Sequence, residues 1–436
     1  MHGEEVKSFL RFLTQAPTAW HAVEALCGRL SAAGWQRVDE GAHWELTPGG
    51  RYYVTRNGSS LIAFALPKSV PENFMIAAAH SDSPTFKIKA VPELEAVGHY
   101  TRLDTEPYGG MIMSTWLDRP LSVAGRLVVR DGARFSTRLV SCRRDLCVIP
   151  NVAIHMNRDV NAGYSWKPNI DLLPLWGSRD ASGGFLRAVA EEAGVDADAV
   201  AGYDLYLVNR VPGCVWGVEE AYLSAGRLDD LECAWSLVEA IADSQAQGHV
   251  NVCCVFDNEE VGSGTRQGAD STFLSGTLSR VAAGLGCDGE EAARLLAGSM
   301  MVSADNAHAT HPNHPEYSDP VNRVWMNEGV VIKHNARQKY CTDAVSSAIY
   351  SEICRRADVP VQHYANRSDL PGGGTLGNIS GSHVSIPAID IGLAQLAMHS
   401  AWETAGALDL PMLVRAMKTW YATGLSLQAD GDYALS

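Results

Sequence analysis

The feature that most constrains this chain is an apolar, β-prone segment, Val250–Phe256, followed directly by a turn that carries Asp257, Glu259 and Glu260. The segment predicts a buried strand, and the turn places the carboxylates at its carboxyl end. An isolated Glu-Glu pair is usually a solvated turn. At the end of a buried strand, crowded carboxylates repel one another and need a cation or a proton among them. Glu259 and Glu260 leave the chain in different directions, so one can hold a metal ion while the other faces its bound water.

Length and charge limit the class of protein. A chain of 436 residues with 46% hydrophobic content can bury a large core in two or three domains, or in one large domain with an insertion. A formal net charge of -15 disfavours a general affinity for nucleic acid or anionic membranes. No apolar run is long enough to span a bilayer, and the N-terminus has acidic residues where a secretory signal has basic ones. The ten cysteines are scattered, which is typical of reduced thiols in a cytoplasmic protein.

Strand and helix patterns alternate in residues 1–85 and 223–436, and residues 86–222 between them have shorter β-like segments. We expect two segments of one α/β domain and a β-rich insertion. Residues 74–79 predict a buried strand that ends at His80 and Asp82, where open α/β sheets bind ligands. The other expected elements are a hairpin across Asn57-Gly58, helices at 18–34, 231–246, 275–285, 290–296, 343–357 and 411–426, and strands at 299–304, 329–333 and 386–391.

Residues of types that can bind metals lie at the ends of several predicted strands and at the start of one predicted helix. They are His80, Asp229, Glu259, Glu260, Asp305 and His399. One His or Asp alone is a weak signal, because most are satisfied by a hydrogen bond or by solvent. Mixed histidine and carboxylate ligands without a thiolate suit zinc, manganese or cobalt in a catalytic site. Two such ions about 4 Å apart need a bridging carboxylate and produce hydroxide at neutral pH.

Five motifs in order along the chain resemble those of the M18 family of metallo-aminopeptidases, the aspartyl aminopeptidase family. They are His80-Ser-Asp82-Ser-Pro, Arg227-Leu-Asp229, Phe256-Asp-Asn-Glu-Glu-Val-Gly-Ser263, Ser303-Ala-Asp305-Asn-Ala-His308-Ala-Thr-His311 and Met398-His399-Ser400. The resemblance covers nearly the whole chain. It implies a three-layer α/β/α zinc-peptidase fold formed by residues 1–85 and 223–436, with an inserted β-rich dimerisation domain at residues 86–222.

The resemblance also implies two divalent ions per subunit, zinc with manganese or cobalt as alternatives. His80 and Asp305 would hold one ion, Glu260 and His399 the other, and Asp229 would bridge both. Glu259 is implied as the general base, and Asp82 as the residue that orients the His80 imidazole. The implied substrate contacts are His155, Glu259, Asp305, His308, Lys333 and Tyr340.

The implied activity is the removal of N-terminal residues, acidic ones (Asp or Glu) in particular, from peptides with a free N-terminus. The implied assembly is a homo-dodecamer built from dimers, in which His155 reaches the active site of a neighbouring subunit. Three alternatives stay open at this point: a broader-specificity aminopeptidase, an amidohydrolase of N-acyl amino acids on the same metal site, and a non-catalytic peptide-binding scaffold.

Two residues depart from the family pattern. Asp230 follows the bridging aspartate where the family usually has asparagine, and it adds negative charge beside the metals. Trp402 stands where the family commonly has arginine, and it removes a cation near the site. The preference for acidic residues therefore depends on Lys333, which we expect to act as a point charge.

Two other patterns are discounted. His308, His311 and His314 recur every three residues, but Pro312 and Pro315 interrupt the helix that would align them. We expect His308 at the substrate and the other two at the surface or behind the site. The glycine run from Pro371 to Gly377 has no following Lys-Ser or Lys-Thr, so a loop against the peptide substrate is favoured over a nucleotide loop.

Overall fold

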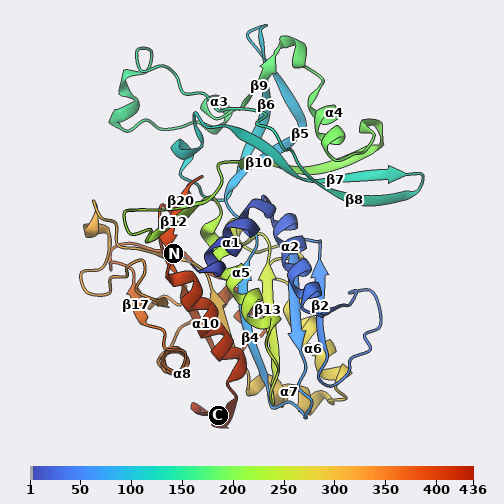
Figure 1. Cartoon of the computed structure of the whole chain (residues 1–436), viewed down its shortest axis with the longest axis vertical. Coiled ribbons are helices and arrows are strands. Elements are labelled where there is room, and N and C mark those ends of the chain that lie inside the picture. The colour runs from blue at the N-terminus through green and yellow to red at the C-terminus, as the bar shows by residue number, and fades with distance from the viewer. Residues whose placement is uncertain (1–2) are drawn as a thin grey trace. The chain divides into compact units, whose positions relative to one another are not determined.

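The structure is a computed structural model that describes residues 3–436, and Figure 1 shows its chain path. The chain forms two compact units. The first unit contains the chain up to Asp82 together with Cys214–Met398 and Glu403–Ser436, and the second contains Ser83–Gly213 and His399–Trp402. The expectation of a mixed α/β protein is confirmed at this level. The oligomerisation role expected for residues 86–222 stays a prediction.

A mixed nine-stranded sheet forms the centre of the first unit. Within it the adjacent strands β13 (Val250–Phe256) and β4 (Phe74–His80) run parallel, with Phe256 opposite His80. Strand β14 (Met300–Ala304) runs parallel on the other side of β4. The turns that follow these three strands therefore meet at one edge of the sheet. In spatial order the strands are β1 (Gln36–Arg37), β2 (Arg51–Arg56), β3 (Ser60–Ala65), β13 (Val250–Phe256), β4 (Phe74–His80), β14 (Met300–Ala304), β18 (Ala388–Gly392), β16 (Val330–His334) and β17 (Val361–Ala365).

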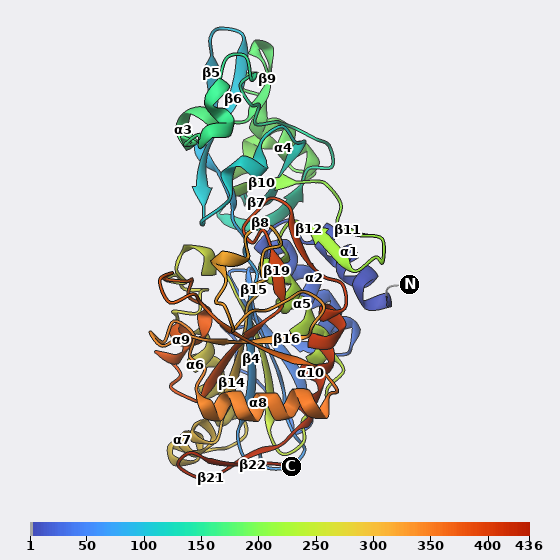
Figure 2. The ribbon, with the colours of Figure 1, turned by 90° about the vertical axis from the view of Figure 1, so that its left-hand side faces the viewer.

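Helices pack on both faces of this sheet (Figure 2). Successive strand residues point to opposite faces, and both faces carry apolar side chains that the helices bury. One face packs against α1 (Glu4–Gln15), α2 (Ala19–Ala32), α5 (Leu228–Ala242), α8 (Ala344–Arg356) and α10 (Asp409–Ala422). The other packs against α6 (Phe273–Gly284), α7 (Gly289–Ala297) and α9 (Leu376–Gly381). In β13, for example, Cys253 lies in the first core and Cys254 in the second.

A smaller five-stranded sheet belongs to the same unit. It contains β11 (Cys214–Trp216), β12 (Tyr222–Ala225), β20 (Glu403–Gly406), β19 (Ala394–Leu396) and β15 (Ala307–His308). A final hairpin pairs β21 (Leu425–Ala429) with β22 (Asp432–Leu435).

Most expected elements of the first unit are present. The hairpin across Asn57-Gly58 is confirmed, and both turn residues have the positive φ that this turn requires, 58° and 68°. The helix expected to continue to Ala246 ends at Ala242, and the last helix ends at Ala422 instead of Ser426. Both predicted helix ends were wrong, because Asp243 and Thr423 leave the helical conformation. After Gly424 the chain pairs as strand β21.

The second unit is built on a six-stranded antiparallel sheet with its own core around Phe86, Trp116 and Phe185. Its strands in spatial order are β8 (Arg134–Ser141), β7 (Leu121–Asp131), β10 (Val200–Asn209), β5 (Thr85–Ala96), β6 (Tyr100–Tyr108) and β9 (Leu175–Ser178), with helices α3 (Pro168–Asp171) and α4 (Phe185–Glu192). Gly125 in β7 has φ 154°, and a Cβ there would lie 2.0 Å from the Asp204 carbonyl oxygen of β10. The two strands approach as closely as they do because this residue is glycine.

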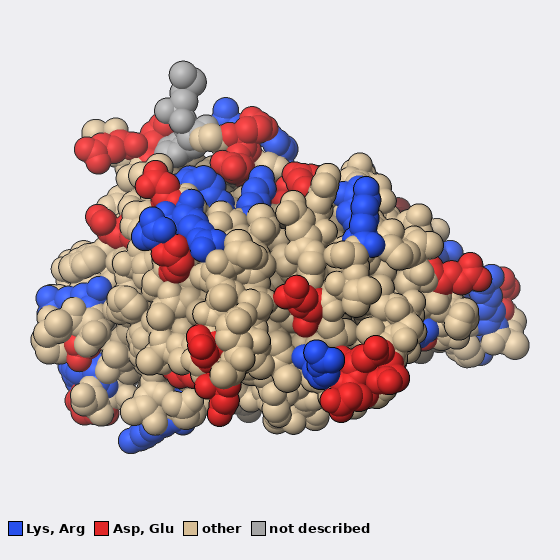
Figure 3. Space-filling view, turned by 90° about the horizontal axis from the view of Figure 1, so that it is seen from below, with Lys and Arg blue, Asp and Glu red and all other residues tan. Residues whose placement is uncertain are grey.

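Acidic and basic residues are interspersed on the molecular face drawn in Figure 3 and are separated by uncharged surface. Within residues 3–436, no helix has the length and apolar composition needed to cross a membrane.

Candidate metal centre

Three strands and one helix of the first unit bring five of the predicted site residues together. His80 ends β4, Asp229 lies at the start of α5, Glu259 and Glu260 follow β13, and Asp305 follows β14. The parallel pairing of β13 and β14 with β4 places three of these segments at one sheet edge. At the end of β18 an added Cβ on Gly392 would lie 2.0 Å from the Asp305 carbonyl oxygen, so the glycine allows β14 to end where it does.

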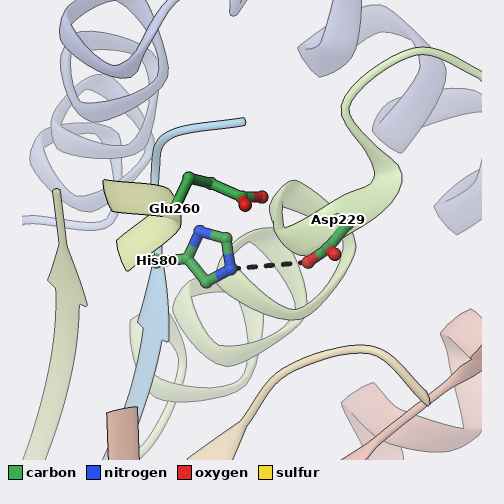
Figure 4. Close-up of side chains that lie close together, drawn as sticks. All are labelled: His80, Asp229 and Glu260. Carbon is green, nitrogen blue, oxygen red and sulfur yellow. Dashed lines mark ion pairs between the residues drawn. The ribbon is translucent and has the colours of Figure 1, made fainter. Parts of the chain in front are cut away.

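The side chains converge on a small volume. His80 Nε2 lies 3.4 Å from Asp229 Oδ1 and 4.0 Å from Asp305 Oδ1. One ligand atom each from His80, Asp229 and Glu260 lies within 4.8 Å of the others, and Figure 4 shows the three side chains directed toward one another. Asp229, Asp230 and Asp305 form a second such group. Asp229 is common to both groups, which is the position that a bridging ligand requires.

Asp82 connects two parts of this cluster. Its Oδ1 lies 3.4 Å from His80 Nδ1 and accepts the Glu259 backbone N–H at 3.1 Å. Its Oδ2 accepts the backbone N–H of Glu260 at 3.2 Å. His80 Nδ1 also lies 3.1 Å from the backbone carbonyl oxygen of Asp82. The carboxylate thus lies beside the His80 ring and holds the turn that carries both glutamates.

The start of α5 is held in an unusual conformation. Asp229 and Asp230 depart from helical dihedral angles, and the peptide bond between them is cis. The backbone N–H of Asp229 donates to Glu403 Oε2 at 3.1 Å, and Asp230 Oδ2 accepts the His80 backbone N–H at 3.1 Å. Asp230 therefore ties α5 to the end of β4.

Burial makes the carboxylates of the cluster resist ionisation. Burial raises the pKa of Glu259 to about 7 and the pKa of Asp305 to about 6. It raises the pKa of Glu260 and of Asp230 well above the ordinary range of carboxyl groups. Divalent cations would remove this penalty, because they replace the protons with fixed positive charge. One imidazole and several carboxylates, with no thiolate, are the donor set of a catalytic zinc or manganese site.

The histidine and the lysine of the site carry the opposite charge. Burial lowers the pKa of His80, but hydrogen bonds with Asp229 and Asp82 outweigh this effect and raise it well above its usual value. Burial also opposes the charged form of Lys333, yet the Asp305 carboxylate outweighs it and raises the Lys333 pKa. Both groups are positive in the metal-free cluster and partly offset its negative charge.

Lys333 and Tyr340 lie beside Asp305, whereas His308 is on the exposed rim. The Lys333 side chain is only 2% exposed, and its Nζ lies 3.5 Å from Asp305 Oδ2 and donates to the Asn306 carbonyl at 3.0 Å. The Tyr340 ring centroid is 5.2 Å from that Nζ. His308 packs edge-on against Tyr364, with ring centroids 6.2 Å apart.

Two of the predicted residues, His155 and His399, belong to the second unit. His155 lies in an exposed loop of that unit. The backbone of His399 has a positive φ of 65°. Their roles at a substrate and at a metal stay predictions. His311 and His314 are exposed, and their rings pack against each other with centroids 5.4 Å apart.

The comparison with known proteins is decisive at the level of family. The model of the family described as aminopeptidase I zinc metalloprotease (M18) matches residues 12–421. A curated relative from Clostridium acetobutylicum, "Probable M18 family aminopeptidase 2", is 42% identical over 426 residues, which are 96% of this chain and 98% of the relative. The chain belongs to the M18 family. It is therefore a metallo-aminopeptidase, a hydrolase, and the scaffold alternative is not retained.

Several solved structures have the same fold as this chain. The chain in the cryo-EM structure of the Ape4 and Nbr1 complex is 32% identical, with a TM-score of 0.93 over 96% of this chain and 85% of that one. The mApe1 dodecamer of S. cerevisiae is 27% identical, with a TM-score of 0.84 over 97% of this chain and 98% of that one.

Sequence reasoning missed two buried acids near the M18 site. Glu403 accepts the Asp229 backbone N–H, and Asp390 in β18 accepts hydrogen bonds from Cys341 and Thr375. Neither lies in a recognisable motif, and isolated carboxylates are usually exposed. Only the apolar segment before Asp390, residues 386–389, gave a signal that this acid is buried.

Proposed function

We propose that this M18 aminopeptidase uses a dinuclear metal site to release N-terminal acidic residues from peptides. The proposed ligands are His80 and Asp305 for one ion, Glu260 and His399 for the other, and Asp229 between them. When bound, the ions polarise the scissile carbonyl and lower the pKa of a bound water. The convergence of His80, Asp229, Glu260 and Asp305 within one buried cluster is the observation that carries this assignment.

The protein side chains then supply proton transfer and orientation. Glu259 acts as general base on the attacking water and passes the proton to the leaving amine. Asp82 fixes the Glu259 backbone and the His80 ring, so base and ligand keep a constant separation. The free α-amine of the substrate binds at the carboxylate-rich site, which confines cleavage to the first residue.

Lys333 is proposed as the residue that selects acidic substrates. An ammonium group has three N–H donors, and those of Lys333 are directed to the Asn306 carbonyl and toward Asp305, which leaves one for a substrate carboxylate. Burial strengthens such an ion pair, since little water screens it. The proposed substrate contacts at His155, His308 and Tyr340 complete the pocket.

The test is hydrolysis of aminoacyl p-nitroanilides of Asp, Glu, Leu, Ala and Lys after chelation and re-addition of zinc, manganese or cobalt. We expect metal-dependent release with kcat/KM at least tenfold higher for Asp or Glu than for Leu. Lys333→Met should lower kcat/KM for the Asp substrate by about 10- to 100-fold, because a desolvated charge-assisted contact is lost. The Leu substrate should change much less.

Lys418→Met, on an exposed position of α10, is the matched control and should leave all rates unchanged. Metal-dependent release that favours neutral residues would show the acidic preference to be wrong and would favour the broader-specificity alternative. The presence of Trp402 in place of arginine favours that alternative.

The same proposal includes the finer fold and assembly: a three-layer α/β/α peptidase domain, an inserted dimerisation domain, a cytoplasmic location and a homo-dodecamer. The S. cerevisiae relative with this fold is a dodecamer, which supports the assembly. Native mass spectrometry should give twelve times the chain mass of 47.0 kDa. A stable monomer with full activity would contradict both the dodecamer and a role for His155 in a neighbouring subunit.

A further inference from the structure

Asp390 is a fully buried carboxylate in β18 that lies next to the proposed substrate pocket and has no role in the mechanism above. Its Oδ2 accepts the Cys341 backbone N–H at 2.6 Å and the Cys341 thiol at 2.8 Å. Its Oδ1 accepts the Thr375 hydroxyl at 2.5 Å. Hydrogen bonds to a buried carboxylate are among the stronger ones in proteins, and this acid receives them from two separate loops.

One loop follows Tyr340, a proposed substrate contact, and the other is the glycine loop that the sequence predicts to lie against the peptide substrate. Cys341 directly follows Tyr340, whose buried ring lies beneath the Lys333 ammonium. Thr375 ends the glycine loop 371–375 and precedes α9. Lys339 Nζ also donates to the Gly372 carbonyl at 3.3 Å, so the two loops contact each other as well as the carboxylate.

The carboxylate is closely packed on the side of α9. A Cβ added at Gly377 would lie 2.7 Å from both Asp390 Oδ1 and Cys341 Sγ. The backbone N–H of Asp390 donates to Thr342 Oγ1 at 2.9 Å, which fixes the loop after Tyr340 at a further point. By contrast, a Cβ at Gly373 or Gly374 would meet nothing within 4 Å, so the tip of the glycine loop faces open space.

We propose that Asp390 is a positioning residue of the substrate pocket: it holds Tyr340 on one side and the glycine loop on the other at a fixed separation. This inference rests on the proposed substrate role of Lys333 and Tyr340. The glycine loop has no side chains at its tip, so its position is set by its anchored end at Thr375. Loss of the anchor loosens the pocket wall without removing any group that reacts.

The test compares Thr375→Val with Thr375→Ser in the metal-loaded enzyme. Valine keeps the shape of threonine but removes the donor, whereas serine keeps the donor. We expect Thr375→Val to raise KM about three- to tenfold with kcat within twofold of wild type, because binding is lost equally in the ground state and the transition state. Amide hydrogen exchange in residues 338–343 and 371–378 should become about tenfold faster. Thr375→Ser should retain wild-type values in both measurements.

Thr423→Val is the matched control, since Thr423 is also buried and donates to a backbone carbonyl at the end of α10. It should change neither KM nor exchange in the two loops. Asp390→Asn weakens the acceptor that both loops share and should accelerate amide exchange in both. If that variant does not fold, the comparison of Thr375→Val with Thr375→Ser tests the positioning role. Equal KM values and equal exchange in Thr375→Val and Thr423→Val would overturn the positioning role.

The test of the positioning role of Asp390 can be distinguished from the test of acidic specificity. An enzyme that prefers neutral residues would show the acidic preference to be wrong, and the Thr375 variants are then compared on the best neutral substrate. A KM increase there supports the role of Asp390, and its absence overturns it. Metal content, measured by elemental analysis, should be the same in all four proteins, because none of the changed atoms contacts a proposed ligand.

Discussion

Glu259→Gln is expected to lower kcat by about 10²- to 10⁴-fold while the protein keeps its full metal content. The glutamine side chain has nearly the shape of the glutamate side chain. The backbone N–H of residue 259 can still donate to Asp82. It cannot accept a proton from water, however, so the step that creates the nucleophile loses its base. Single-turnover kinetics together with elemental analysis of bound metal would check both parts of this expectation.

Glu24→Gln is a suitable control, because Glu24 is exposed on α2. It should leave kcat and metal content unchanged. A Glu259→Gln enzyme with near-normal turnover would contradict the proposed mechanism, whereas loss of metal along with activity would show that Glu259 is itself a ligand.

Removal of the metal ions is expected to make thermal stability strongly dependent on pH. In the metal-free fold, burial raises the pKa of Asp305 to about 6 and of Glu259 to about 7, against ordinary values near 4 in an unfolded chain. Between these limits the folded state binds more protons than the unfolded state, so stability falls as pH rises. The raised pKa of His80 acts in the same direction, because its protonated form is stabilised in the fold.

We therefore expect the melting temperature of the chelated protein to fall by about 5 °C or more between pH 5 and pH 8. The metal-loaded protein should change much less, because bound cations stabilise the folded state and replace the protons. Differential scanning calorimetry of both forms over this range would measure the difference. Asp305→Asn removes one of the carboxyl groups and should reduce the pH slope of the metal-free form. Parallel curves for the loaded and chelated proteins would contradict the predicted electrostatics of the site.

The sequence by itself determined the elements whose signals are local. The apolar runs that became β4, β13 and β14 predicted buried strands, and the residues after them predicted a metal centre at their carboxyl ends. The Asn57-Gly58 hairpin was equally clear, since only a few residues tolerate its positive φ angles. Collinear motifs were also sufficient to identify the M18 family, because those motifs carry the residues that the chemistry requires.

The tertiary structure decided what depends on contacts between distant segments. The resemblance to the family implied Lys333 as a substrate contact, but only the fold shows that its side chain is buried against Asp305. Asp82 looks like a partner of His80 alone, yet it also accepts the backbone N–H groups of Glu259 and Glu260. Asp390 gives no functional signal at all in the sequence. Hydrogen bonds of buried carboxylates join residues far apart in the chain, and no local periodicity records which donors will surround them.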